Sequence, residues 1–164
     1  IIISKGGKIM KKDKTKIIAT TISILLKISI VIGVILLLCL WKILEVLNIK
    51  FDLLVFLIYP SGILFLMLVY QFIKLFKLLK IENPFSMIMV KYLKETMWIS
   101  FIIGIIILIA LLLSIFVYPT YTIAVKISLT FFTILFIGVG IALYLLSELF
   151  KQATEYKEEN DLTI

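Results

Sequence analysis

Four apolar stretches, each long enough to cross a lipid bilayer, constrain this chain more than any other feature. They cover approximately residues 17–47, 53–73, 96–118 and 127–147. A helix needs about 20 apolar residues to span the roughly 30 Å hydrocarbon core of a membrane. Because lipid offers no partners for backbone polar groups, each stretch is predicted to be a transmembrane helix. The sequence therefore predicts an all-α integral membrane protein, a four-helix bundle.

The first stretch is the least regular, because it contains Lys27, Lys42 and Glu45. The residues between the two lysines make only about 21 Å of helix. Long lysine side chains can reach the membrane interface, so a full crossing is still expected. A cleaved signal peptide is the alternative, and we reject it because no small-residue cleavage motif follows Leu40.

The domain organisation follows from the same pattern. Residues 10–164 are predicted to form a single membrane domain that ends in a tail, residues 148–164. Residues 5–10 read KGGKIM, which an in-frame ribosome-binding site followed by a start codon would encode. Residues 1–9 are therefore interpreted as a translated leader or a disordered segment.

The distribution of lysine predicts the orientation. Lysines are dense before the first stretch and between the second and third, and sparse in the other two connections. By the positive-inside rule, both termini and the middle connection lie in the cytoplasm. Helices two, three and four are then expected to extend beyond the membrane into the cytoplasm. Lys74, Lys77 and Lys80 form a stripe there, and we expect them to contact anionic lipid headgroups; a topology signal alone is the simpler interpretation.

Two further cytoplasmic segments are candidates for docking a partner. Asn83 is a favourable N-cap and Pro84 suits the first helical position, so a helix is predicted to begin there with Phe85 exposed. The acidic tail is the second segment. Acids at a helix C-terminus oppose the helix dipole, so they would be better satisfied by lysines of this chain or of a partner. The candidate docking residues of the tail are Glu158, Glu159, Asn160, Asp161, Leu162 and Thr163. The alternative is a tail that is only solvated.

Few side chains inside the apolar stretches could carry chemistry. Lys27 and Glu148 are predicted to form an ion pair near the cytoplasmic interface. Glycines at 138 and 140 are interpreted as points of close helix packing. A polar transport path would have only hydroxyl groups, which more often bond helix backbones. Those hydroxyl residues are Ser100, Ser114, Ser128, Thr130 and Thr133.

Catalysis, cofactor binding and metal binding have no support in the sequence. The chain has no His and a lone Cys39, and it lacks the common hydrolase, metalloprotease and phosphate-loop motifs. Its basic residues are all lysine, whereas direct nucleic-acid readers rely on arginine. We therefore expect a protein that is not an enzyme, has no cofactor and binds no nucleic acid directly.

Two motifs resemble those of a known bacterial family. The NPFS motif at residues 83–86 and the EENDLTI ending at residues 158–164 are similar to a family of four-span membrane proteins, domain of unknown function 2975. The resemblance extends over nearly the whole chain from Met10. It implies a place in the bacterial cytoplasmic membrane and no established activity. Members often lie beside a small helix-turn-helix regulator in the genome, which implies a membrane partner of such a regulator.

Three functional hypotheses follow. The first is a regulatory membrane partner of a small helix-turn-helix transcription regulator, held by the middle connection or the tail. The second is a self-immunity protein against a membrane-active peptide or bacteriocin. The third is a small transporter or channel subunit. Self-association into a homo-oligomer is compatible with each of them.

Overall fold

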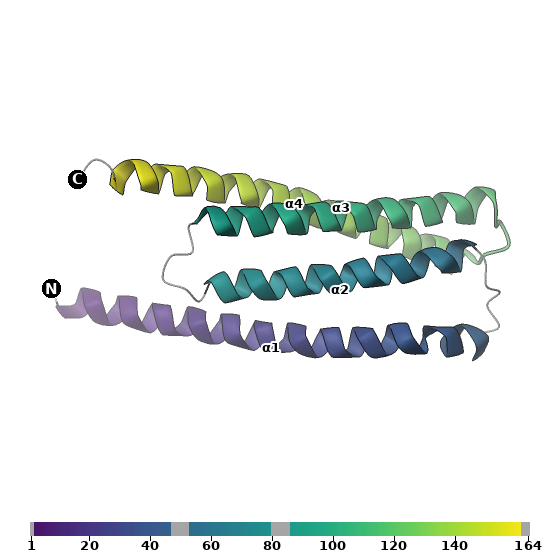
Figure 1. Cartoon of the computed structure of the whole chain (residues 1–164), viewed down its shortest axis with the longest axis horizontal. Coiled ribbons are helices and arrows are strands. Elements are labelled where there is room, and N and C mark those ends of the chain that lie inside the picture. The colour runs from purple at the N-terminus through teal and green to yellow at the C-terminus, as the bar shows by residue number, and fades with distance from the viewer. Residues whose placement is uncertain (1, 47–52, 80–85, 162–164) are drawn as a thin grey trace.

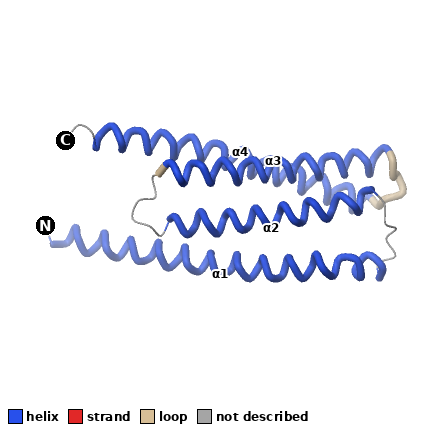
Figure 2. Tube along the Cα trace, viewed as in Figure 1, coloured by secondary structure: helices blue, strands red, loops and turns tan. Residues whose placement is uncertain are grey.

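The computed structural model describes residues 2–46, 53–79 and 86–161, and helices account for nearly all of them (Figure 1). The helices are α1 (Ile2–Val46), α2 (Leu53–Leu79), α3 (Met87–Phe116) and α4 (Ile123–Asp161). Each contains a segment long and apolar enough to cross a membrane. The prediction of an all-α protein with four candidate membrane spans is confirmed (Figure 2).

Consecutive helices run antiparallel, and each packs mainly against the next along the chain. Figure 1 shows the start of α1, the end of α4 and the adjoining ends of α2 and α3 together at one end of the bundle. Among the described residues, the backbones of α1 and α4 do not approach each other closely. The bundle is therefore open along the edge between α1 and α4.

The start of α3 differs from the prediction. Ser86 is the N-cap, with φ −145° and ψ 150°, and its side chain accepts a hydrogen bond from the backbone N–H of Met89 over 3.4 Å. A serine N-cap satisfies one of the free amides of the first turn, as Asn83 was predicted to do. The helix thus begins after Ser86, and the predicted start at Asn83 and Pro84 is wrong. Asn83, Pro84 and Phe85 themselves lie outside the described residues.

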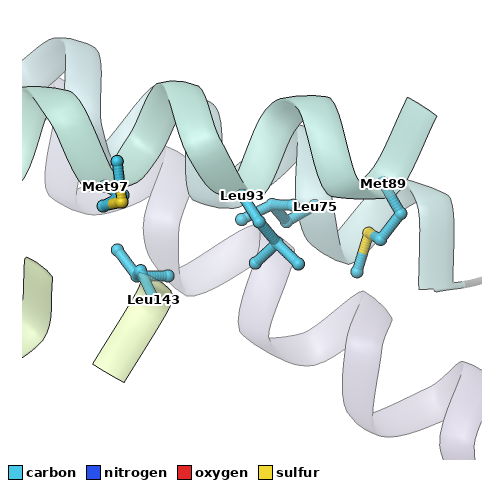
Figure 3. Packing of buried hydrophobic residues seen from close by; sticks show 5 residues of the cluster. All are labelled: Leu75, Met89, Leu93, Met97 and Leu143. Atoms are coloured by element: carbon cyan, nitrogen blue, oxygen red, sulfur yellow. The ribbon is translucent and has the colours of Figure 1, made fainter. Parts of the chain in front are cut away.

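The hydrophobic core lies between α2, α3 and α4, toward the end of the bundle where α1 begins. Figure 3 shows its central side chains, which come from three helices. They are Leu75, Met89, Leu93, Met97 and Leu143. Most large apolar side chains elsewhere are exposed. That pattern is expected of a surface covered by lipid, where apolar side chains gain little by packing against one another.

The interface between α3 and α4 uses small residues to bring the helices close together. Ser100 Oγ, fully buried, donates to the backbone carbonyl of Phe136 on α4 over 2.8 Å. A β-carbon built on Gly140 would lie 2.8 Å from the ring of Phe101, whereas one on Gly138 would meet nothing within 4 Å. The predicted close packing is confirmed at Gly140 and wrong at Gly138.

Candidate functional site

Charged and polar side chains from all four helices lie in one layer across the bundle, which we call the polar layer. Side-chain contacts link α2 to α3 and α3 to α4, and Lys27 of α1 lines the same cavity as Lys74, so these side chains lie at a similar depth along the bundle. The polar layer consists of Lys27 of α1, Gln71 and Lys74 of α2, Lys94 and Glu95 of α3, and Glu148 of α4.

The depth of the polar layer follows from helix geometry. From Lys94 to Phe116, where α3 ends, the helix rises about 33 Å. The hydrocarbon core of a bilayer is about 30 Å thick. If α3 crosses a membrane, the polar layer therefore lies at one surface of the hydrocarbon and not at its centre. Such a position suits interfacial ammonium groups and argues against a charged relay through the bilayer.

The predicted ion pair between Lys27 and Glu148 is not formed. Glu148 Oε1 lies 3.7 Å from Lys94 Nζ instead, and both side chains are more than a third exposed. Lys27 lines a cavity together with residues of α2, and the described part of its helix does not approach α4. The sequence places both residues near the same surface, but the order of helices around the bundle gives Glu148 a nearer lysine.

Glu95 has a partner on α2. Gln71 Nε2 donates to Glu95 Oε2 over 3.1 Å, in partly buried surroundings. The other end of that amide, Gln71 Oε1, is buried and has no hydrogen-bond partner among the described residues. The two acids of the polar layer are thus both engaged, Glu95 by Gln71 and Glu148 by Lys94.

A cavity of about 760 Å³ lies in the polar layer between α1, α2 and α3, and we call it the basic cavity. Three lysines and two tyrosines line it, and its described lining includes no acid. The lining residues are Ser23, Lys27, Tyr70, Ile73, Lys74, Lys77, Leu78 and Tyr92.

Lys74 is held by two aromatic rings. Its Nζ lies 4.7 Å from the ring centroid of Tyr70 and 5.2 Å from that of Tyr92. Cation–π contacts of this kind contribute about 0.5–1 kcal/mol each at exposed sites. Lys74 and Lys77 belong to the predicted lysine stripe. Both line the basic cavity, which α1 also lines. Lys80, the third, lies outside the described residues.

The acidic end of α4 extends past the polar layer. From Glu148 to Asp161 the helix rises about 20 Å. Glu158, Glu159 and Asn160 are exposed on it, and Asp161 is its final residue. The predicted docking residues Leu162 and Thr163 lie outside the described residues.

The hydroxyl groups that a transport path would need are occupied. Each one donates to a backbone carbonyl, at 2.7–2.9 Å. These donors are Ser100, Ser114, Ser128, Thr130 and Thr133. Within the described residues, no group of three His, Cys, Asp or Glu side chains could hold a metal ion.

Sequence reasoning missed the two tyrosines, Gln71 and Glu95. Tyr70 and Lys74 are four residues apart and so share a helix face, a signal that was present in the sequence. Tyr92 and Glu95 become neighbours of α2 only through the way α2 and α3 pack, which no local pattern reveals.

Comparison with known proteins identifies the family. A family model described as "Protein of unknown function (DUF2975)" matches residues 11–164. The chain therefore belongs to this family, as the resemblance in its motifs implied. Searches of curated proteins and of solved structures gave no match.

Proposed function

We propose that this member of the family is a non-enzymatic, multi-pass protein of the bacterial cytoplasmic membrane that regulates a small helix-turn-helix transcription regulator by holding it at the membrane. The observation that carries the proposal is the acidic end of α4. It extends about 20 Å past the polar layer, at the end of the bundle where α1 also begins.

The charge of this segment suits a DNA-binding partner. Residues 152–161 contain four acids and one lysine, hence a net charge of −3. Glu155, Glu158 and Glu159 recur at helical spacing, so they share one face of α4. Proteins that bind DNA present basic surfaces to its phosphates. An acidic helix face can occupy such a surface and so compete with DNA for the regulator.

The proposal includes an orientation, in which the end of the bundle with the start of α1 and the end of α4 faces the cytoplasm. The lysines near the start of α1 and around the connection between α2 and α3 outnumber those at the other end of the bundle. The positive-inside rule then places the end of α4 in the cytoplasm, where a soluble regulator can reach it.

Co-purification from cells tests the proposal. The full-length protein is expressed together with a small helix-turn-helix regulator of the kind expected as its partner, and the membrane protein is captured in a mild detergent. The double variant Glu158→Gln and Glu159→Gln keeps the helix but removes two charges, and it is expected to reduce capture severalfold. Deletion of residues 158–164 is expected to abolish it.

The control is Glu45→Gln, which removes an exposed carboxylate near the opposite end of the bundle. It is expected to leave capture unchanged, and capture by the unaltered protein is expected to weaken as salt is raised. Capture that survives deletion of residues 158–164 would show that the tail is not the docking segment.

A further inference from the structure

We propose that the basic cavity is a binding site for the phosphodiester headgroup of an anionic membrane lipid of the phosphatidylglycerol type. This assignment is independent of the proposed regulatory role. It differs from general attraction of lysines to a negative surface, because it assigns one lipid to one cavity built by three helices.

The described lining of the cavity holds three lysines and no acid. Within the described residues, none of the three lining lysines, Lys27, Lys74 and Lys77, has a carboxylate oxygen within 4.0 Å of its Nζ. Glu148 pairs with Lys94, and Glu95, which accepts a hydrogen bond from the neutral amide of Gln71, does not line the cavity. Like charges gathered around one cavity at the edge of the hydrocarbon repel each other, so an anion bound among them would be stabilised.

The cavity also holds hydroxyl groups. Ser23 is only 6% exposed and lines the basic cavity. A hydroxyl group can donate a hydrogen bond to a phosphate oxygen. A phosphate oxygen in the cavity is an acceptor that Ser23 could donate to. The tyrosine hydroxyls of Tyr70 and Tyr92 are further donors lining the cavity.

Depth and shape favour a lipid over a soluble anion. The cavity lies in the polar layer, at the level where the phosphates of one leaflet are expected. Its volume of about 760 Å³ is in the usual range for small-molecule sites, about 300–1,000 Å³. Ile73 and Leu78 add apolar lining beside the lysines. A headgroup with its glycerol and upper acyl chain matches a lining of this mixed kind, whereas free phosphate would match only its charged part.

Occupancy would also hold α1 in place. The backbone of α1 closely approaches only that of α2 within the described residues, yet it contributes Ser23 and Lys27 to the cavity. A lipid phosphate bound between Lys27 and Lys74 would join α1 to the other helices through charge-assisted hydrogen bonds.

The test is lipid binding by the full-length protein in neutral detergent, measured by native mass spectrometry. Phosphatidylglycerol is titrated against phosphatidylcholine. The single variants Lys27→Gln, Lys74→Gln and Lys77→Gln are compared with Lys91→Gln, an exposed lysine of α3 that does not line the cavity. Each cavity variant is expected to bind phosphatidylglycerol about fivefold more weakly, and the triple variant about a hundredfold. Lys91→Gln is expected to bind as the unaltered protein does.

Three results would overturn the proposal. They are equal binding of phosphatidylcholine and phosphatidylglycerol, an equal loss in Lys91→Gln, and displacement of the lipid by millimolar inorganic phosphate. The last would assign the cavity to a soluble phosphate. Circular dichroism of each variant separates loss of the site from loss of the fold.

Discussion

Replacing Gly140 by alanine tests the close packing of α3 and α4. A β-carbon at this position would lie 2.8 Å from Cε1 and 2.9 Å from Cδ1 of Phe101. Ordinary contact begins near 3.4 Å, so the ring would have to move by 3.4 − 2.8, or about 0.6 Å. Overpacking of a well-packed interface costs about 1–3 kcal/mol.

Gly138 supplies the matched control, because a β-carbon there meets nothing within 4 Å. Both replacements gain the same helix propensity, about 1 kcal/mol. The difference between Gly140→Ala and Gly138→Ala therefore isolates the contact with Phe101. We expect Gly140→Ala to be less stable than Gly138→Ala by about 1–3 kcal/mol in the free energy of unfolding.

Unfolding of the full-length protein in mixed detergent and SDS micelles measures this difference. Trp98 reports on the interface, because its ring centroid lies 6.5 Å from that of Phe101. Replacing Trp41 by phenylalanine leaves Trp98 as the reporter. The further change Phe101→Leu is expected to restore stability to Gly140→Ala by making room. Equal stability of the two alanine variants would refute the packing that the structure describes.

Three other changes test the remaining contacts. Ser100→Ala removes a hydrogen bond between helices and is expected to lower the free energy of unfolding by about 0.6 kcal/mol. Ser128→Ala removes a bond within its own helix at an exposed site and should lower it less. The same unfolding assay measures both. Gln71→Leu leaves partly buried Glu95 without its donor and is expected to destabilise by about 1–3 kcal/mol, whereas Glu95→Gln, whose amide can also accept and donate, should be close to neutral in that assay. Lys94→Gln breaks a partly exposed ion pair and is expected to change stability by less than about 1 kcal/mol, with any loss vanishing in high salt. A larger loss would mean that the pair is shielded from solvent.

The helices could be predicted from the sequence because lipid imposes a simple requirement. A span must be apolar over its whole length, so the hydrophobic pattern locates each helix approximately. The helix ends are harder to locate from the sequence. The helices α2, α3 and α4 continue beyond the apolar stretches through residues that also form helices in water. The choice between Asn83 and Ser86 as N-cap could not be made locally, since both side chains can cap.

Contacts between helices were harder to predict. Gly138 and Gly140 are two residues apart and point about 200° apart on a helix, so both could not face α3. Which of them does depends on the rotation of α4, which is determined by its partner. Glu148 was assigned to the wrong lysine for a related reason: charge and depth were apparent from the sequence, but not the order of the helices around the bundle.

We propose that four helices cross the membrane, with the start of α1 and the end of α4 in the cytoplasm. Cysteine labelling in whole cells tests this arrangement most directly, at both ends of α3 and α4. In a background where Cys39 is serine, single cysteines replace Thr120 between α3 and α4, Lys91 in α3 and Glu158 in α4. We expect a membrane-impermeant maleimide to label position 120 in intact cells, and positions 91 and 158 only after permeabilisation. Labelling of positions 120 and 91 from the same side would contradict the crossing of α3, and the reverse pattern would contradict the orientation.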